Sequence, residues 1–401
     1  MLTRTLIAAA FAASIPLGLL GATEAPAPPS TAGSLDAAAV SAAQAALAVD
    51  LLVRLSAEDP SANLVLSPAS VAAALSVAAI GASDEGRAAI ARTLGFKDRA
   101  DGPDHILQSM RDLPNSDADP LAMAVRIVFD RSLALQPDAA GKLESRGADH
   151  GVDDLSTAPA VERINAWVAG ATRGAIPTIL DAPTGPGFVS LGALHFKAKW
   201  RTAFDPAETR ALPFRRADGA ADPVPTMRLA PGPGWFRTDD RFVAVDLPYS
   251  DERYGLVLVA GRNEAGVTAA DLPHLKDWLA AAGFEDRKGD VMMPRFRLSD
   301  GRELLAALDH AGLSPARLKP DAFFGFTREP LEIRRIVQKT ALEVDEAGTT
   351  AAAATAVIAE RSIDPAFVHV VADAPFLVAL RDRSTGLLLI VGLVGDPGGV
   401  D

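Results

Sequence analysis

Residues of the types that carry out catalysis occur in this sequence, but not at the spacings that catalysis or metal binding requires. There is no cysteine, which excludes disulfides, thiolate metal sites and cysteine nucleophiles. The G-x-S-x-G elbow, the S-x-x-K and H-E-x-x-H motifs and the phosphate-binding G-x-x-x-x-G-K loop are all missing. Carboxylates are scattered, and no metal-ligand spacing joins the six histidines, which are His105, His150, His195, His274, His310 and His369. We therefore expect no metal and no cofactor, while a Ser/His/Asp triad, whose members need not be close in sequence, stays open.

The unusual segment of the chain is Glu343 to Pro365. It follows a strand-like stretch and continues as a run of small uncharged residues, mostly alanine. Composition alone favours an alanine-rich surface helix, since alanine is the best helix former. However, the run has no amphipathic stripe, and three threonines interrupt it. Small residues at every position would also suit a segment that slides into a tight sheet.

Composition and charge limit the class of protein. The 401 residues carry 39 basic and 51 acidic side chains, a net charge of −12, which argues against nucleic acid or an anionic membrane surface as the main partner. Hydrophobic residues make up 49% of the chain, so a large core is expected rather than disorder.

The N-terminus has the layout of a secretory signal peptide. A short positive start, Met1 to Arg4, precedes an uncharged apolar run to Leu20 and then small residues. Cleavage is expected after Ala22 or Ala25, and export to an extracellular or periplasmic location follows. We predict a signal peptide over 1–25, a Pro/Ala-rich linker over 26–34 and one folded domain over 35–398. No later segment is expected to span a membrane.

The pattern of apolar residues predicts helices early and strands late, which indicates an α+β fold. The first helix is expected over 34–55, and a fully buried one over 71–80, with Ser67 as its cap and Pro68 in its first turn. A third helix is expected over 164–174. The predicted strands cover 124–129, 189–200, 242–247, 256–259, 291–297, 336–344, 368–372, 376–380 and 387–394.

Several separated motifs, in order and at suitable spacings, make the chain resemble the serpin family from about residue 35 to residue 397. The matching segments are Ser67-Pro68-Ala69-Ser70; Ile164-Asn165-Ala166-Trp167-Val168 with Thr172, Gly174 and Ile176; Phe196-Lys197-Ala198-Lys199-Trp200 with Phe204-Asp205-Pro206; Met293-Pro294-Arg295-Phe296; Ile336-Val337-Gln338-Lys339-Thr340-Ala341; Glu346-Ala347-Gly348-Thr349; Ala372-Asp373-Ala374-Pro375-Phe376-Leu377; and Gly392-Leu393-Val394-Gly395-Asp396-Pro397. Each motif is weak alone, but together they identify the chain as similar to a secreted, prokaryote-type serpin.

The resemblance implies a serpin fold, with helices packed around three β-sheets and an exposed reactive-centre loop. It implies a serine protease inhibitor rather than an enzyme. The protease cleaves the loop, forms an acyl-enzyme, and is trapped when the loop inserts into the main sheet. The hinge residues would be Glu346, Gly348, Thr349, Thr350, Ala351, Ala352, Ala353 and Ala354. The residues of the shutter and the breach, where that sheet opens, would be Ser67, Pro68, Ser70, Gly192, Trp200 and Gln338.

Two features of the loop favour insertion. The residues from Thr349 to Ala354 carry no charge and no proline, so their burial in a sheet leaves no unpaired charge. The 13 residues from Thr349 to Arg361 span about 43 Å when extended, which matches a full strand of a large sheet.

The chain departs from the family pattern at the shutter. The family usually has a histidine at the position of Gln338 and an asparagine at that of Gly192. On the alternating face from Ile336 to Val344, Gln338 is the one large polar residue. A buried amide without a partner costs about 1–3 kcal/mol, so Gln338 needs a partner that the sequence does not identify.

Two positions for the scissile bond stay open. Local sequence around Arg361-Ser362 resembles antithrombin-type loops with one residue deleted, and Arg361 is the one basic residue of the loop. A trypsin-like protease, whose primary pocket holds a buried acid, is therefore the favoured partner. Counting from Gly348 at the usual loop length gives Ser362-Ile363 instead, and an elastase- or subtilisin-like partner.

The main alternative function is a non-inhibitory serpin that acts as a binding or carrier module; a secreted hydrolase is a third. A monomer is expected. Heparin binding is not expected, because the region from Asp98 to Pro120, where heparin-binding serpins carry basic clusters, is acidic. Its basic residues are Arg99 and Arg111, and its acidic ones are Asp98, Asp101, Asp104, Asp112, Asp117 and Asp119.

Overall fold

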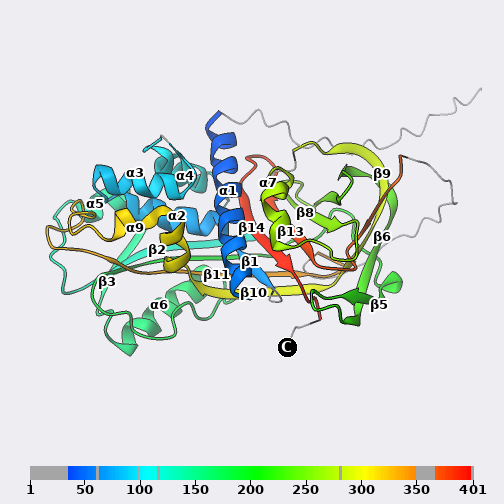
Figure 1. Ribbon diagram of the computed structural model, residues 1–401. Helices are drawn as coiled ribbons and strands as arrows, with labels where there is room; N and C mark the ends of the chain where they lie inside the picture. Colours follow the sequence, from blue (N-terminus) through cyan, green and yellow to red (C-terminus); the bar gives the residue numbers. More distant parts are fainter. Residues whose placement is uncertain are drawn as a thin grey trace, which may run out of the picture.

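The computed structural model describes residues 35–59, 63–97, 99–114, 118–279, 282–348 and 366–398. Helices gather at one end of the molecule and strands run through its length (Figure 1). The α-helices are α1 (Leu35–Glu58), α2 (Pro68–Ala79), α3 (Asp84–Thr93), α4 (Gly102–Arg111), α5 (Ala139–Ser145), α6 (Ala158–Ala171), α7 (Leu272–Leu279), α8 (Leu305–Leu308) and α9 (Ser314–Arg317), and the single-turn elements are η1 (Pro206–Glu208), η2 (Ala269–Asp271) and η3 (Asp309–Leu313).

A five-stranded sheet carries the segments of greatest interest. Its order is β10-β11-β4-β2-β3. The strands are β10 (Phe296–Glu303), β11 (Ile333–Val344), β4 (Phe188–Phe196), β2 (Leu121–Asp130) and β3 (Asp149–Asp153). The central pair, β4 and β11, is parallel, with Gln338 opposite Gly192, while the flanking pairs β10–β11 and β4–β2 are antiparallel. The middle of this sheet therefore joins two strands that are far apart in sequence and run in the same direction.

The second sheet has nine strands, ordered β1-β14-β13-β8-β7-β6-β9-β12, with β5 beside β6. The strands are β1 (Leu64–Leu66), β5 (Arg210–Arg215), β6 (Ala221–Thr238), β7 (Phe242–Pro248), β8 (Tyr254–Gly261), β9 (Glu285–Pro294), β12 (Val368–Val371), β13 (Phe376–Asp382) and β14 (Leu388–Val394). The family resemblance implies three separate sheets. In the structure, however, the 18-residue β6 pairs both with β9 and, at its C-terminal end, with β7. Hydrogen bonds therefore join the strands on either side of β6 into one path.

Helix α2 fills the space behind the five-stranded sheet, and helix α1 packs beside it against β1 and β14 of the nine-stranded sheet. Every residue of α2 is buried, as its all-round apolar sequence predicts. Ser67 caps this helix by accepting a hydrogen bond from the Ser70 amide, and Pro68 lies in its first turn. Helix α1 corrects one expectation, because Ala37–Glu58 is long and apolar enough to cross a membrane. However, 61% of the apolar 18-residue stretch of this helix is buried inside the protein, as in a core helix.

Helix α6 covers the opposite face of the same sheet (Figure 1). Its inward side chains Ile164 and Val168 pack against Val189, Leu191 and Val337 of the central strands. The faces of β4 and β11 therefore alternate between the core under α2 and the smaller layer under α6, and a side chain's position along either strand decides which layer it enters.

The predicted elements differ from the observed ones at two strands. The strand expected over 189–200 ends at Phe196, and Trp200 lies in an isolated bridge. The strand expected over 291–297 divides at Arg295 into β9 and β10, because its two halves pair in different sheets. The final hairpin, β13 and β14, is confirmed.

Candidate functional site

The segment from Glu343 to Pro365 begins with the last two residues of β11, at the C-terminal end of the parallel strand pair. The structure describes it as far as Gly348. The predicted hinge residues Thr349, Thr350 and Ala351–Ala354 and the predicted bond residues Arg361, Ser362 and Ile363 lie outside the described residues. The site can therefore be built from the two ends of this segment and from the sheet beside it.

Gly348 makes a sharp turn against the loop that follows β4. Its φ is +108°, a conformation that side chains disfavour. A Cβ atom here would stand 2.4 Å from the Ala198 carbonyl oxygen and 2.5 Å from the Trp200 amide nitrogen, both backbone atoms. Gly348 also forms antiparallel bridges with Lys199 and with Asp345. The chain can therefore turn closely past β4 only because this residue is glycine.

Trp200 fastens the same turn through backbone and indole hydrogen bonds. Its amide donates to the Ala347 carbonyl at 3.0 Å, and its indole Nε1 donates to the Asp345 carbonyl at 2.9 Å. The indole stacks on Tyr249 with ring centroids 4.4 Å apart and 13° between the planes. The turn at 345–348 is therefore held by Trp200, in the segment that follows β4, and does not project freely.

Glu346 provides a buried carboxylate at this turn. Arg295 donates to both carboxylate oxygens at 2.7 Å, and the Thr209 hydroxyl donates to Oε1. Burial alone would raise the pKa of Glu346, but the hydrogen bonds from Arg295 and Thr209 outweigh it and hold that pKa below its ordinary value. The carboxylate therefore links β11 to the β9–β10 junction and to the start of β5.

Ser67, Ser70 and Gln338 form a buried polar cluster halfway along the parallel pair. The Ser67 amide donates to the Gln338 Oε1 at 2.6 Å, and the two serine hydroxyl oxygens lie 2.7 Å apart. This contact identifies the partner that the sequence left open. The Gln338 Nε2 and the Thr340 hydroxyl, two positions along β11, have no hydrogen-bond partner among the described residues. The cluster is thus only partly satisfied.

Gly192 lies opposite Gln338 and directly over the start of α2. A Cβ atom at this position would stand 2.9 Å from both the Ser70 Cβ and the Ser70 carbonyl oxygen. The strand and the helix therefore approach more closely than any larger residue allows. This contact explains why the position does not hold the asparagine that is usual in the family. The Gln338 side chain, on the opposite strand, accepts a hydrogen bond from the Ser67 amide instead.

Several functional contacts carried no signal in the sequence. Arg295, Thr209 and Tyr249 join the turn at 345–348 from three separate elements. Only the Met-Pro-Arg-Phe motif pointed to the neighbourhood of Arg295, and nothing singled out the other two. Their roles depend on long-range packing, which spacing along the chain does not encode.

Three of the described histidines contact aspartates. His105, His274 and His369 each lie within 3.1 Å of an aspartate, and no imidazole of a described histidine bonds a serine hydroxyl. Burial, followed by the nearby Lys197 and Arg173, lowers the pKa of the half-buried His195. Within the described residues no cluster of three or more His, Asp or Glu side chains could hold a metal.

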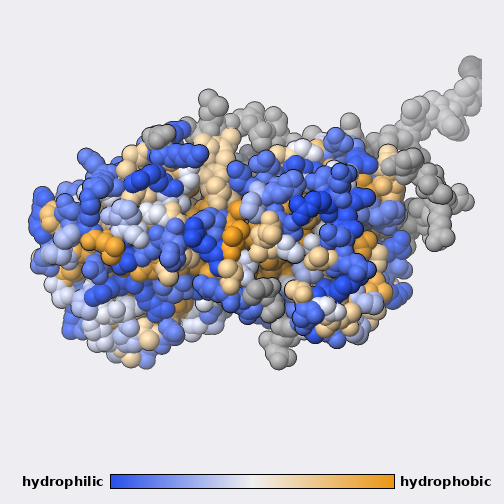
Figure 2. Space-filling model, viewed as in Figure 1, coloured by the Kyte–Doolittle hydropathy of each residue, from blue (hydrophilic) through white to orange (hydrophobic). Residues whose placement is uncertain are grey.

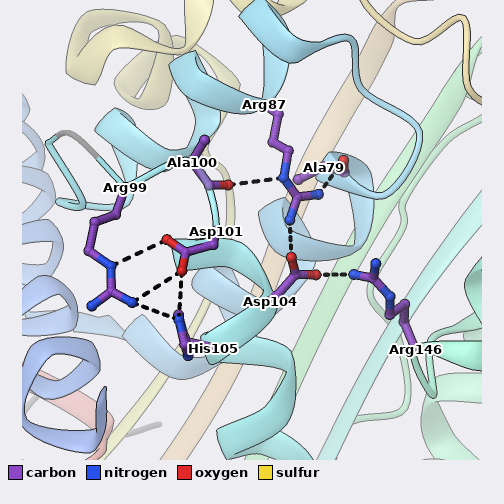
Figure 3. A network of polar contacts seen from close by, with 8 residues as sticks. All are labelled: Ala79, Arg87, Arg99, Ala100, Asp101, Asp104, His105 and Arg146. Atoms are coloured by element: carbon purple, nitrogen blue, oxygen red, sulfur yellow. Dashed lines mark hydrogen bonds and ion pairs between the residues drawn. The ribbon is translucent and has the colours of Figure 1, made fainter. Parts of the chain in front are cut away.

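The region around α4 is a network of paired charges (Figure 3). Arg87 and Arg146 both bind the carboxylate of Asp104, and Arg99 binds Asp101 at 3.1 Å. The pKa of Asp101 is lowered to about 2, first by the hydrogen bond from Arg99 and then by that from His105. The basic side chains drawn here are thus directed at neighbouring carboxylates rather than gathered into an open cationic patch.

The surface on one face is mostly hydrophilic, and its hydrophobic residues occur in small groups (Figure 2). Among the described residues the exposed large hydrophobic side chains are Val152 and Leu318, which come from different elements. Neither the polar clusters nor this face therefore indicates a broad apolar docking surface.

Comparisons with known proteins agree on one family. A family model described as serpin (serine protease inhibitor) matches residues 42–397. Iripin-2 of Ixodes ricinus is 30% identical over 364 residues, which cover 86% of this chain and 90% of that protein. Leukocyte elastase inhibitor of Bos taurus is 28% identical, covering 89% of this chain and 99% of the relative.

Solved structures show the same fold. The thermophilic serpin tengpin in its native state superposes with a TM-score of 0.78 at 24% identity, covering 89% of this chain and 94% of that one. Maspin superposes with a TM-score of 0.79 at 21% identity, covering 90% of this chain and all of that one.

Proposed function

The chain belongs to the serpin family, and we propose that it is a secreted inhibitor of serine proteases that acts as a suicide substrate. The folded domain spans 35–398, and a signal peptide over 1–25 directs its export. The proposed bait is the segment between Gly348 and Ala366, with Arg361-Ser362 as the scissile bond and Ser362-Ile363 as the alternative.

The chemistry of trapping needs no catalytic group from this chain. The protease serine oxygen attacks the carbonyl carbon of Arg361, and the peptide bond to Ser362 breaks. The nitrogen of Ser362 leaves as an amine after it takes a proton from the protease histidine. Arg361 then remains bound to the protease as an ester. Water would hydrolyse that ester unless the freed loop first moves the protease away and distorts its active site.

The parallel pair β4–β11 is the observation that carries this proposal. A segment that leaves the end of β11 and folds back runs antiparallel to β11. It would therefore also run antiparallel to β4. Its insertion would replace one parallel pair by two antiparallel pairs, which are slightly more stable per residue. The turn needed to fold back is present at Asp345–Gly348, where the two residues already form an antiparallel bridge.

The same bridge sets a register for the inserted strand. Counting outward from Asp345 opposite Gly348 puts Thr349 opposite Val344 and Thr355 opposite Gln338. Residues directly opposite share a face of the sheet, so the Thr355 hydroxyl would enter the buried cluster beside the Gln338 amide. The Gln338 Nε2 has no described partner in the present state, and a hydroxyl can accept its hydrogen bond. Insertion would thus give the Gln338 amide nitrogen the partner that it now lacks.

The test is incubation of the purified protein with trypsin and, separately, with elastase, followed by denaturing electrophoresis and mass spectrometry. We expect a covalent complex with trypsin and a released fragment that begins at Ser362. A complex with elastase and a fragment that begins at Ile363 would select the alternative bond. Cleavage within 349–365 without any complex would reject the inhibitory function and favour a non-inhibitory binding or carrier module.

A further inference from the structure

A cavity of about 680 Å³ lies outside the polar clusters described above. Its lining residues include Thr238 of β6, Arg287 of β9 and three residues of the edge strand β12, and Figure 1 labels β6 and β9 at one end of the molecule. Its volume falls within the range of pockets that hold small molecules, roughly 300–1,000 Å³. None of its lining residues takes part in the turn at 345–348 or in the Ser67–Gln338 cluster.

The cavity lining combines cationic and apolar residues. Arg215 of β5, Arg262 just after β8 and Arg287 of β9 contribute guanidinium groups. Phe367 and the buried Val243 and Val368 are apolar members of the same lining. Such a combination suits a ligand that carries a charge at one end and an apolar body at the other.

The guanidinium groups are only partly occupied by protein. Arg262 makes one described side-chain hydrogen bond, from Nη1 to the Thr238 hydroxyl at 3.0 Å. Arg215 has Glu264 as its described ionic partner, at 3.7 Å, and that carboxylate is 90% exposed. Arg287 donates from Nε and Nη2 to the Ala366 carbonyl. Donors therefore remain for an anion, since a guanidinium carries five N–H groups and pairs well with planar carboxylate, phosphate and sulfonate groups.

The lining also contains two carboxylates, and these limit the ligand's charge. Glu264 and Asp373 offset two of the three arginines, so the cavity has a small positive excess rather than a strong field. A ligand with a single negative charge fits that excess better than a polyanion does.

We propose that this cavity is a binding site for a small organic anion, with an aromatic or aliphatic body against Phe367, Val243 and Val368 and an acidic group held by Arg215 and Arg262. The proposal does not rest on loop cleavage or insertion. It assigns the protein a ligand-binding capacity that an inhibitor and a non-inhibitory serpin could equally possess.

The experiment uses the intact protein and anilinonaphthalene sulfonate, an aromatic anion, with binding measured by titration calorimetry. We expect saturable binding of one probe per chain. The double variant Arg215→Gln/Arg262→Gln should weaken it by about tenfold or more, because both charge-assisted contacts are lost. Arg297→Gln is the matched control, since it makes the same change of charge at an exposed residue of β10 and should leave the affinity within about twofold of wild type.

Neutral phenylnaphthylamine, which lacks the sulfonate, tests the role of charge. It should bind wild type at least about tenfold more weakly and be insensitive to the double variant. Absence of saturable one-to-one binding, equal binding of the neutral probe, or an unchanged affinity in the double variant would each overturn the proposal. If the double variant fails to fold, the single Arg262→Gln variant, which loses one described hydrogen bond, takes its place with the same expected direction.

Discussion

Gly348 is the residue whose identity is most tightly constrained at the base of the loop. Replacing it with alanine should destabilise the intact protein by about 1–3 kcal/mol from backbone strain alone, and by more through contact with the Ala198 and Trp200 backbone. The measurement is the midpoint of thermal unfolding at a fixed heating rate. Gly170→Ala is the control, because Gly170 lies within α6, and a Cβ there would meet nothing within 4 Å. The control should be neutral or stabilising by about 0.5–1 kcal/mol.

Glu346 should make the turn at 345–348 sensitive to acid. Its pKa is lower in the folded protein than its ordinary value of 4.5, so its stabilising contribution is present above that value. The contribution is lost as the pH falls through the folded pKa. We expect Glu346→Gln to be less stable than wild type at pH 7 and the difference to shrink below about pH 4.5. Thermal unfolding of both proteins across this range measures it.

Glu264→Gln gives the matched comparison for that pH series. Glu264 is 90% exposed, and its replacement should leave the profile almost unchanged. A Glu346→Gln protein whose stability differs from wild type by a constant amount at every pH would contradict the proposed role of the carboxylate.

At the scale of elements, the sequence predicts what local pattern determines. Helix α2 was predictable because Ser67, Pro68 and a run of apolar residues act within a few positions of one another. Strand β6 carried no such signal, since its four prolines normally argue against a strand. The pairing of β6 with β9 shifts register between Leu229 and Gly232, around Pro231, whereas Pro223, Pro225 and Pro233 keep their places in the pairing with β5 and β9.

The partners of the site residues could not be predicted for a similar reason. Ser67 and Gln338 are 271 positions apart, and only the assembled sheet brings the Ser67 amide to the Gln338 side chain. Gly192 could be recognised as a departure from the family pattern, but its contact with Ser70 depends on how closely β4 approaches α2. Spacing along the chain thus identified the residues and left their contacts undetermined.

The register of the inserted strand can be tested by placing a charge on each face of the sheet. Thr349 would lie opposite the buried Val344 and Thr350 opposite the exposed Glu343. Thr349→Arg should therefore bury an unpaired guanidinium and slow insertion. It should raise the number of inhibitor molecules consumed per protease inactivated by about tenfold or more, since about 1.4 kcal/mol in a barrier is tenfold in rate.

Thr350→Arg is the matched control, because its guanidinium would stay on the outer face beside the Glu343 carboxylate. That ratio should remain close to the wild-type value. Equal effects of the two substitutions would refute the proposed register, and an unchanged ratio for Thr349→Arg would mean that this residue does not insert.

At the scale of the whole molecule, the charge distribution predicts indifference to sulfated polysaccharides. Arg87 and Arg146 are held by Asp104, and Arg99 by Asp101 (Figure 3). Arg111 instead donates to the Gln108 amide oxygen, so this region offers one cation without a described carboxylate partner rather than a cationic cluster. Added heparin at low salt should change the rate of protease inhibition by less than about twofold. A severalfold increase that disappears at high salt would contradict this expectation.

The central claim concerns the state of the main sheet before and after cleavage. Intact protein has five strands in this sheet with a parallel pair at its centre. In the proposed mechanism this state does not have the lowest free energy, and it persists because a kinetic barrier prevents insertion. Cleavage of the loop removes that barrier, and the sheet should then gain an additional central strand and a large increase in stability.

The most direct test compares the thermal unfolding of intact protein with that of protein cleaved within 349–365. We expect a large rise in the unfolding temperature after cleavage. The rise should be clearly smaller for cleaved Thr349→Arg, whose first inserting residue carries the buried charge. An unfolding temperature that does not rise on cleavage of the wild-type protein would show that the loop stays outside the sheet, and would contradict the inhibitory mechanism.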